Sequence, residues 1–286
     1  MAEPVAIGID VGGTKVAVGA VRADGDLEHR IQLATAQATP LDVANAAAGV
    51  AAQLGEDADV LGVGVGICEL VHDGEVRSAT SVPWTTSELA EALAGIGPVA
   101  VEADVVAAAA AEAAFGAGRA FSSFLYITVG TGISHCLVLA GEPYRGAHGC
   151  AQLSGSARLT LRCSHCGERV ELSVEEVASG AAVARAGDSV AALDEAAVSL
   201  GALIALLVNV LDPEAVIAGG GLGSAGGAYW DALVRAARDH VWAEHVADLP
   251  ILRAGLGPDS GLIGAGWLGL RAAAAHDDHT RRGPVR

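Results

Sequence analysis

The sequence predicts an α/β protein, and two observations support this fold class. Apolar runs rich in β-branched residues recur along the chain, and two of them, at 5–21 and 124–140, are interrupted by glycine turns. Ala-rich stretches with helical character lie between the apolar runs. Strands that alternate with helices indicate an α/β fold whose ligands bind beyond the carboxyl ends of the strands.

The predicted elements follow one another with short connections. The run 5–21 gives two strands joined at Gly12-Gly13, followed by a helix at 41–54, a buried strand at 60–67, a short strand at 99–102 and a helix at 105–115. The run 124–140 repeats the first design, with a Gly-Thr-Gly turn between two strands. The second half predicts helices at 174–186 and 189–211, a strand at 215–218, and helices at 229–242 and 261–275.

Composition and charge exclude several classes of protein. With 52% hydrophobic and 18% charged residues in 286, a compact globular chain is expected and general disorder is excluded. The net charge of −17 argues against a nucleic-acid partner, because phosphate binding needs clustered Lys and Arg. The first residues show no secretory pattern, and the apolar segment 202–211 is short for a membrane span. We therefore expect a cytoplasmic protein without a membrane partner.

The first glycine turn has the chemistry of a phosphate site. Asp10 ends an apolar strand and is followed by Gly12, Gly13, Thr14 and Lys15. Glycines let a phosphate approach the backbone, a carboxylate can orient hydrated Mg²⁺, and Thr14 and Lys15 can donate to phosphate oxygens. The spacing fits neither a Walker loop nor GxGxxG, and an ordinary tight turn is the alternative interpretation.

Two further glycine segments extend this interpretation. Gly130, Thr131 and Gly132 offer the same chemistry from the second hairpin, so that the two turns could hold a triphosphate from both sides. Gly219, Gly220 and Gly221 directly follow the strand AVIA and would let an adenine or ribose approach the backbone. The alternative for this last segment is a close strand-to-helix turn.

Five motifs in this order resemble the ROK family of sugar kinases, repressors and open reading frames. They are DVGGTK at 10–15, EAD at 102–104, TVGTGI at 128–133, LDPEAVIAGGG at 211–221 and GLIGAG at 261–266, and they span nearly the whole chain. The resemblance implies a two-lobed actin-like (RNase H-like) ATPase fold with its active site in the interlobe cleft. The expected lobes are 1–118, completed by the helix 261–275, and 119–260, with 276–286 as a flexible tail. The family's repressors carry an N-terminal helix-turn-helix domain, whereas this chain reaches its first nucleotide-loop strand at Val5, so a kinase-type member is implied.

The resemblance implies an ATP- and Mg²⁺-dependent phosphotransferase with an alcohol group as acceptor. Phosphoryl transfer needs positioning, charge neutralisation and a carboxylate that accepts the hydroxyl proton, and Asp104 is the candidate general base. The alternative role for Asp104 is an N-cap of the helix that starts at Val105. Family members commonly form dimers, so a homodimer is also expected.

The acceptor-binding positions depart from the family pattern. Where kinase members have an Asn before a Pro/Trp segment, an Asn between Glu and Asp, and a Gly-Glu…His element, this chain has Ser81, Ala103, Cys150 and Leu153, and Glu175 best matches a later Glu. We expect Ser81, Glu102, Asp104, Cys150 and Glu175 to contact the substrate. Missing hydrogen bonds to sugar hydroxyls predict poor use of glucose and a less conventional polyol, such as an altered sugar or a C7 cyclitol.

The resemblance also raises the question of zinc. The family often holds a structural zinc with one His and a CxCGxxGC cluster, and this cluster is incomplete here. His148, Cys150, Cys163 and Cys166 form an H-x-C-x12-C-x2-C arrangement that offers four ligands of the kinds that zinc prefers. Free or redox-active thiols in a loop are the alternative.

Two other functions compete with a kinase. A degenerate family member could bind a ligand or nucleotide for sensing without transferring phosphate, which the altered acceptor positions favour. An ATP-hydrolysing assembly protein of the actin type shares the fold class, but the sequence shows no long insertion that would support polymer formation.

Overall fold

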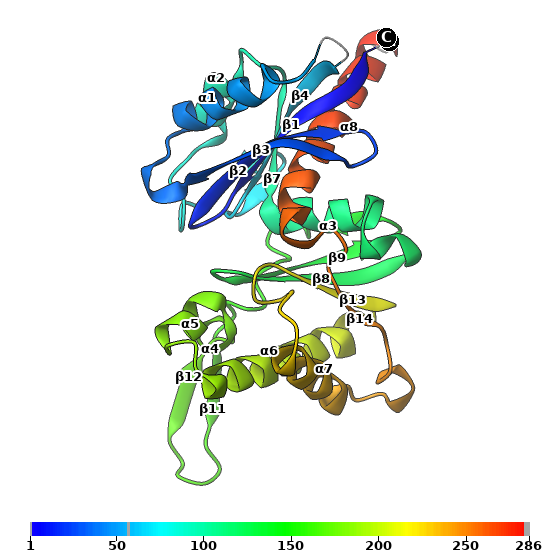
Figure 1. Cartoon of the computed structure of the whole chain (residues 1–286). Helices are drawn as coiled ribbons and strands as arrows, with labels where there is room; N and C mark the ends of the chain where they lie inside the picture. The colour runs from blue at the N-terminus through cyan, green and yellow to red at the C-terminus, as the bar shows by residue number, and fades with distance from the viewer. Residues whose placement is uncertain (1, 56–57, 283–286) are drawn as a thin grey trace. The chain divides into compact units, whose positions relative to one another are not determined.

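The first of two five-stranded sheets is built on the N-terminal hairpin. The computed structural model describes residues 2–55 and 58–282 (Figure 1). The sheet has the order β3-β2-β1-β4-β7. Its strands are β1 (Glu3–Val11), β2 (Lys15–Arg22), β3 (Leu27–Ala34), β4 (Ala58–Ile67) and β7 (Val99–Ala103). Strands β1, β4 and β7 run parallel, so that their carboxyl ends lie at one edge, while β2 and β3 are antiparallel additions.

Helix α8 (Ser260–Arg282) packs closely against this sheet and against α3 (Asp104–Ala114). A Cβ on Gly64 of β4 would lie 1.7 Å from the Ala265 carbonyl oxygen, and one on Gly264 would lie 2.0 Å from the Ala107 carbonyl oxygen. The GLIGAG motif therefore serves close helix packing. Helices α1 (Pro40–Ala51) and α2 (Thr86–Leu93) complete this unit, and each begins with a capping box.

The second sheet has the order β10-β9-β8-β13-β14. Its strands are β8 (Ser123–Val129), β9 (Ile133–Leu139), β10 (Glu142–Tyr144), β13 (Ala215–Gly219) and β14 (Ile251–Arg253). Helices α4 (Glu175–Ala178), α5 (Gly180–Arg185), α6 (Val190–Leu211) and α7 (Ala228–His240) accompany it. Buried side chains of α6 and α7 pack with those of β8 and β13 in one hydrophobic core.

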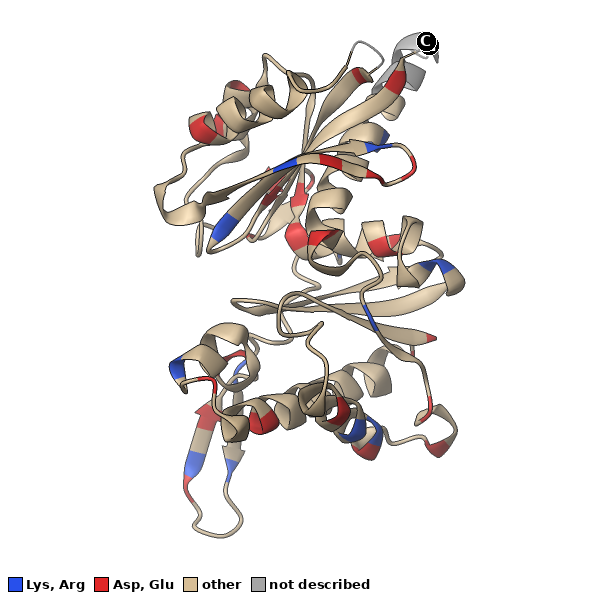
Figure 2. Cartoon of the chain, in the orientation of Figure 1, with Lys and Arg blue, Asp and Glu red and all other residues tan. Residues whose placement is uncertain are grey.

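Helix α6 is 22 residues long, which is longer than its most apolar segment suggests. It could cross a membrane by length and composition alone, a weak criterion that buried core helices also meet. Figure 2 shows that it is almost free of charged residues. Leu200, Ile204 and Val208 are buried in the core, as the predicted buried helix requires.

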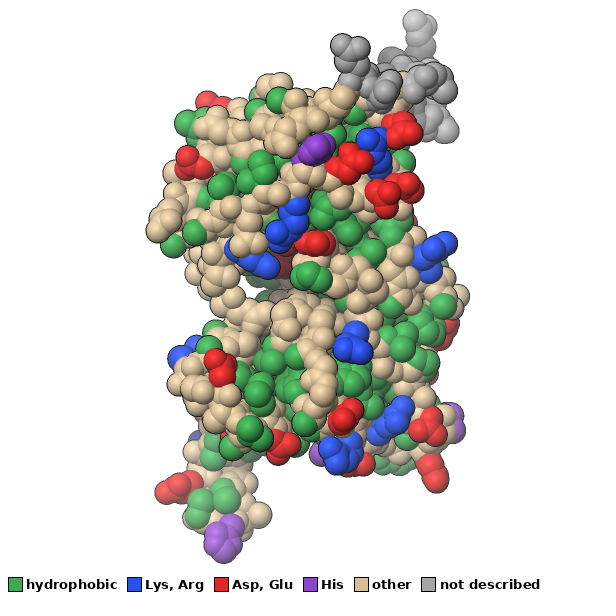
Figure 3. All heavy atoms as spheres, in the orientation of Figure 1, with side chains coloured by type: hydrophobic (Ala, Val, Ile, Leu, Met, Phe, Trp, Pro, Cys, Tyr) green, Lys and Arg blue, Asp and Glu red, His purple; other side chains and the backbone are tan. Residues whose placement is uncertain are grey.

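Two small hairpins and four short helices complete the described chain. The hairpins are β5 (Val71–His72) with β6 (Glu75–Val76), and β11 (Leu159–Arg162) with β12 (Arg169–Leu172). The 3₁₀ helices are η1 (Thr35–Gln37), η2 (Ala117–Ala120), η3 (Glu244–Val246) and η4 (Gly257–Asp259). The β11–β12 hairpin extends away from the helices of its own unit, and hydrophobic side chains are exposed on it (Figures 1 and 3).

The chain divides into two compact units. The first contains Met1–Gly116, Arg145–Cys150 and Asp259–Arg286, as far as the structure describes these ranges, and the second contains Ala117–Tyr144 and Ala151–Pro258. The expected boundaries assigned 145–150 to the second lobe. This segment instead joins the first unit, because Arg145 pairs with Glu102 and the backbone at Gly149 lies against the Val71 carbonyl group.

Two predicted helices differ from the structure. The predicted helix 174–186 is divided into α4 and α5, because Ser179 is extended and its hydroxyl accepts a hydrogen bond from the Ala182 N–H. The final helix was expected to end at 275, with a tail from 276, but α8 continues to Arg282. The sequence contains no Gly or Pro between 276 and 282 that would stop it. The rest of the predicted tail, 283–286, lies outside the described residues.

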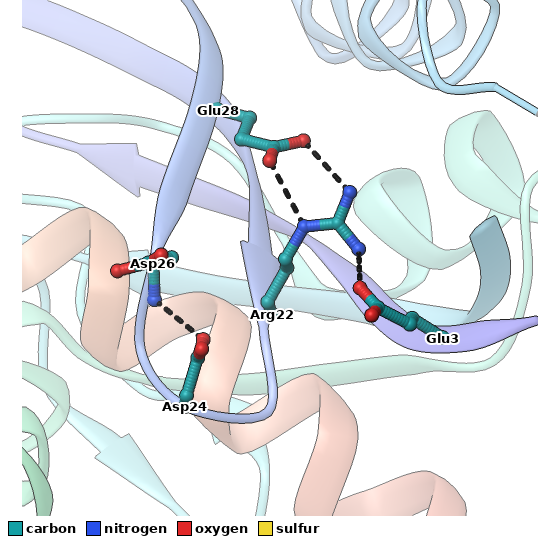
Figure 4. A network of polar contacts seen from close by, with 5 residues as sticks. All are labelled: Glu3, Arg22, Asp24, Asp26 and Glu28. Carbon is teal, nitrogen blue, oxygen red and sulfur yellow. Dashed lines mark hydrogen bonds and ion pairs between the residues drawn. The ribbon is translucent and has the colours of Figure 1, made fainter. Parts of the chain in front are cut away.

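Ion pairs at the surface join the first three strands of the first sheet. Arg22 of β2 donates to both carboxylate oxygens of Glu28 in β3, at 2.9 and 3.2 Å, and also pairs with Glu3 of β1 (Figure 4). Exposed pairs of this kind contribute little to stability, because solvent screens them. The sheet is therefore held mainly by its buried strands, with β3 as an exposed edge.

Candidate functional site

Three parallel strands of the first unit end at the same edge, and each is followed by an acid or ends in one. In the register of the sheet, Asp10 of β1 pairs with Gly66 of β4, and Gly66 pairs with Glu102 of β7. Asp104 follows β7 directly, and Glu69 follows β4 after one intervening residue. The fold thus brings together carboxylates that are far apart in the sequence.

The first glycine turn connects β1 to β2 as predicted. The Gly12 N–H donates to the Lys15 carbonyl oxygen at 2.9 Å, and the hydroxyl of Thr35 donates to the Gly12 carbonyl oxygen at 2.7 Å. Gly13, Thr14 and Lys15 are exposed, and a Cβ on Gly13 would meet no atom within 4 Å. The turn therefore presents an open backbone with a lysine beside it, which suits an anionic group.

Asp10 is partly buried at the start of this turn. Burial and the charge of Asp104 raise its pKa to about 7, while Lys15 opposes the shift. A Cβ on Gly261, in the first turn of α8, would lie 2.9 Å from a carboxylate oxygen of Asp10. A divalent cation held by Asp10 would offset this charge, so the carboxylate of Asp10 fits the Mg²⁺ expected from the sequence.

Asp104 occupies the first turn of α3. Ala103 takes the N-cap position without a side-chain hydrogen bond, and Asp104 Oδ1 accepts the N–H of Val105 at 2.6 Å. The alternative N-cap role is thus wrong in detail, although the carboxylate does bind a backbone N–H of this turn. Burial raises the pKa of Asp104 to about 6, the bond from Val105 opposes this rise, and the charge of Glu69 adds to it. Such a carboxyl group can take up a proton near neutral pH.

The other acceptor residues predicted in the first unit differ in exposure and contacts. Glu102 receives the guanidinium of Arg145 and the N–H of Ala103, the latter at 3.1 Å. Ser81 is exposed, and its backbone N–H donates to Glu69. Cys150 is also exposed, and its thiol lies 3.4 Å from the His148 carbonyl oxygen.

Sequence reasoning missed Glu69. Its side chain is buried, with 5% of the residue exposed, and it accepts hydrogen bonds from Ser78, Thr80, Ser81 and Val82. An acid two residues beyond a buried parallel strand could have indicated it, since Asp10 and Asp104 were found at corresponding strand ends. Its neighbour Cys68 is not nucleophilic, because burial, Asp104 and Glu69 raise the pKa of the thiol to about 12.

In the second unit, hydrogen bonds within the turn and from neighbouring residues hold the Gly130–Gly132 turn. The Gly130 N–H donates to the Gly132 carbonyl oxygen at 3.0 Å, and the Gly130 carbonyl oxygen accepts the N–H of Gly180 in α5 at 2.8 Å. Glu175 Oε2 accepts the N–H of Ile133 at 2.7 Å. One oxygen of the predicted acceptor residue Glu175 therefore holds the turn.

The Gly219–Gly221 segment supports part of the structural alternative. A Cβ on Gly219 would lie 2.1 Å from the Tyr126 hydroxyl, and Gly220 has a left-handed φ of +79°. Close packing and backbone conformation thus require these two glycines. Gly221 differs, because a Cβ there would meet no atom within 4 Å. Only this third position leaves room for a ligand next to the backbone.

The four predicted zinc ligands are divided between the two compact units. His148 and Cys150 belong to the first unit, whereas Cys163 and Cys166 lie on the β11–β12 hairpin of the second. Across the described part of the chain, no group of three or more His, Cys, Asp or Glu side chains could hold a metal ion. A zinc site made by these four residues stays a prediction. Cys163 and Cys166 do not form a disulfide with each other.

Comparison with known proteins identifies the family of this chain. The ROK family model matches residues 6–189 and 183–272. The glucokinase of Streptomyces coelicolor is 30% identical over 91% of this chain and 95% of its own length. The N-acetylmannosamine kinase of Pasteurella multocida is 29% identical over 91% of this chain and 95% of its own length.

A solved structure confirms the predicted fold class. The ROK family glucokinase of Streptomyces griseus, in complex with glucose and AMPPNP, aligns with a TM-score of 0.78 and 29% identity. The alignment covers 93% of this chain and 99% of that protein. The α/β, actin-like kinase fold expected from the motifs is therefore correct. With its family model matched from β1 into α8, the chain belongs to the ROK family.

Proposed function

We propose that this protein is an ATP-dependent kinase that phosphorylates a hydroxyl group of a sugar or sugar-like polyol, with Asp104 as general base. The main support is the pair of partly buried carboxylates at the ends of β1 and β7, whose pKa values are raised to about 7 and about 6. The assignment is also supported by two relatives, a glucokinase and an N-acetylmannosamine kinase, which this chain matches over almost their whole length.

Residues of both units have roles in this proposal. Asp10 would hold Mg²⁺, which neutralises phosphate charge when bound. Gly12, Gly13, Thr14 and Lys15 would bind phosphate oxygens with backbone and side-chain donors, as would the turn of Gly130, Thr131 and Gly132. Gly221 leaves space for the base or ribose, and Gly219 and Gly220 shape the strand end beside it.

The chemical step follows from the position of Asp104. Its carboxylate takes the proton of the acceptor hydroxyl while that oxygen bonds to the γ-phosphorus, and the bond from phosphorus to the ADP oxygen breaks. Raising the pKa towards neutral strengthens the base, and about half of the carboxyl groups remain ionised near pH 6. The proton thus passes to Asp104, and the phosphoryl group passes from ATP to the acceptor oxygen.

The acceptor is proposed to be an uncharged polyol other than glucose, such as a C7 cyclitol. Ser81 and Ala103 occupy positions where sugar-kinase members carry an Asn, so hydrogen bonds to glucose hydroxyls would be lost. The carboxylates of Asp10, Glu69 and Asp104 would repel an anionic acceptor. A homodimer in the cytoplasm is proposed from the family resemblance.

A screen for ATP consumption tests this function. The purified protein would be incubated with MgATP and glucose, N-acetylmannosamine, other sugars or cyclitols, and ADP release and phosphorylated product would be measured. We expect a polyol other than glucose to be turned over with the higher kcat/KM. Efficient turnover of glucose at low concentration would contradict the proposed acceptor, and absence of product from every polyol would contradict the kinase.

A ligand or nucleotide sensor is the second candidate. The altered acceptor positions at Ser81 and Ala103 favour it, since a binding protein needs no sugar hydroxyl placed for attack. The two candidates differ in the role of Asp104, which only a kinase requires for turnover.

A further inference from the structure

Glu69 is a buried acid whose hydrogen bonds all reach one short segment. Its Oε2 accepts the Ser78 hydroxyl and the Thr80 N–H, the latter at 2.9 Å. Its Oε1 accepts the backbone N–H groups of Ser81 and Val82, the latter at 2.8 Å. A buried carboxylate is costly unless it is hydrogen-bonded, and here four donors satisfy both oxygens.

The segment that Glu69 holds, 78–82, is the loop that carries Ser81. Two further bonds join the start of this loop to the strand end: Leu70 N–H donates to the Ser78 hydroxyl at 2.9 Å, and Arg77 N–H donates to the Leu70 carbonyl oxygen at 2.7 Å. Beyond Arg77, the backbone groups of Thr80, Ser81 and Val82 bind to the Glu69 carboxylate. The position of Ser81 therefore depends on Glu69.

Glu69 is also coupled to Asp104 by charge. It follows β4, the strand next to β7, and its charge raises the pKa of Asp104. Burial raises the pKa of Glu69 itself, but its hydrogen bonds outweigh burial and the net pKa is lowered, so Glu69 stays ionised near neutral pH. Asp104 also interacts with Asp10 and raises the pKa of that carboxyl group. The positive charges of Lys15 and Arg30 lower the pKa of Asp10.

We propose that Glu69 is a positioning residue that fixes the loop 78–82 beside the strand end carrying Asp104, and thereby sets the affinity for the phosphate acceptor. This inference rests on the proposed kinase function. With both oxygens bound to the loop, Glu69 acts on the acceptor through Ser81 and through the charge that Asp104 experiences.

The chain offers a matched control. Glu88 also uses its carboxylate to accept a backbone N–H and a hydroxyl, both from Thr85, at 2.8 and 2.7 Å. It belongs to the capping box of α2. It is not one of the groups that shift the pKa of Asp104. Glu69→Gln and Glu88→Gln therefore remove the same charge from two hydrogen-bonded acids of one unit, of which Glu69 is buried and Glu88 is exposed.

Amide hydrogen exchange and steady-state kinetics would be measured on both full-length variants. In Glu69→Gln, we expect faster exchange at 80–82, because the new NH₂ group faces N–H donors. With any polyol that the wild-type protein phosphorylates in the screen, we expect the acceptor KM to rise about tenfold or more, with the ATP KM changed less than about twofold. The acidic limb of the kcat profile should move to lower pH, since Asp104 loses a neighbouring negative charge. Glu88→Gln should leave both KM values and the pH profile unchanged.

The outcomes separate this inference from the proposed function. Faster exchange at 80–82 with an unchanged acceptor KM and pH profile would show that Glu69 has only a structural role, and would overturn the inference. Unchanged exchange would overturn it directly, whatever the kinetics. If the wild-type protein phosphorylates no polyol, the kinase proposal fails and the acceptor part of the inference fails with it, while exchange still decides whether Glu69 fixes the loop.

Discussion

The β1–β2 and β8–β9 hairpins have the same design, but different groups lie beside their turns. The first turn is exposed and lies between Asp10 and Lys15, and Gly13 faces open space. The second turn contains no charged residue, and it is held by hydrogen bonds with Gly180 and Glu175. This difference teaches that a repeated backbone design can be specialised. In our proposal, the first hairpin supplies charge for Mg²⁺ and phosphate, and the second supplies a rigid set of backbone donors.

Among the charged residues of the first unit, Asp104 should have the largest effect on turnover when it is replaced. We expect Asp104→Asn to lower kcat by about 10²–10⁴-fold, because the asparagine cannot accept the hydroxyl proton. Nucleotide affinity, measured by calorimetry with AMPPNP, should change little. A variant that retains wild-type turnover would remove the general base and favour the sensor, whereas loss of AMPPNP binding would point to misfolding.

Asp10→Asn should separate activity from stability. The pKa of Asp10 is raised in the folded chain, so its stabilising contribution is complete below about pH 4 and is lost as the pH rises through about 7. At pH 8 the variant without ligand should therefore be more stable than the wild type, by about 1–3 kcal/mol in urea unfolding. Its turnover with MgATP should fall strongly, because the carboxylate proposed to hold Mg²⁺ is gone.

A stability gain that is the same at pH 4 and pH 8 would contradict this cause. In the wild type, kcat/KM should rise with pH between about 5 and 7 as Asp104 and Asp10 ionise.

Gly132→Ala and Gly130→Ala test the rigid side of the contrast. A Cβ on Gly132 would lie 2.7 Å from Glu175 Oε2 and displace the bond to Ile133, whereas a Cβ on Gly130 would meet no atom within 4 Å. We expect Gly132→Ala to lower the free energy of unfolding by about 1–2 kcal/mol and to weaken AMPPNP binding. Gly130→Ala is the matched control for stability. Equal effects of both changes would show that Glu175 does not hold the turn.

Thiol labelling should show a smaller contrast between the two units. Hydrogen bonds from Cys166 and His165 lower the pKa of Cys163 on the β11–β12 hairpin, whereas burial raises the pKa of Cys68 to about 12. With iodoacetamide at pH 7.5, followed by mass spectrometry of peptides, Cys163 should be modified well before Cys68. If Cys163 and Cys166 are both protected from labelling until a chelator is added, the result would instead support the predicted zinc site.

The sequence already predicted most of the central strands and the two turns. Gly12-Gly13 and Gly130–Gly132 interrupt apolar runs, and local conformational preference is enough to make them hairpin turns. Asp104 was identified because it lies between a strand and a helix, where local pattern and chemistry coincide. By contrast, β3, α2 and the β11–β12 hairpin were missed, and β3 and the hairpin strands are largely exposed, with weak apolar patterns.

Local sequence by itself determined the α/β class, the central strands and the glycine turns, because these depend on residues close together in the chain. Only tertiary structure decided which distant groups meet. Parallel strand register places Asp10, Glu69 and Asp104 at one edge, and packing moves 145–150 into the first unit. Motif spacing cannot reveal such results, since each depends on long-range pairing of whole strands and not on the residues between the motifs.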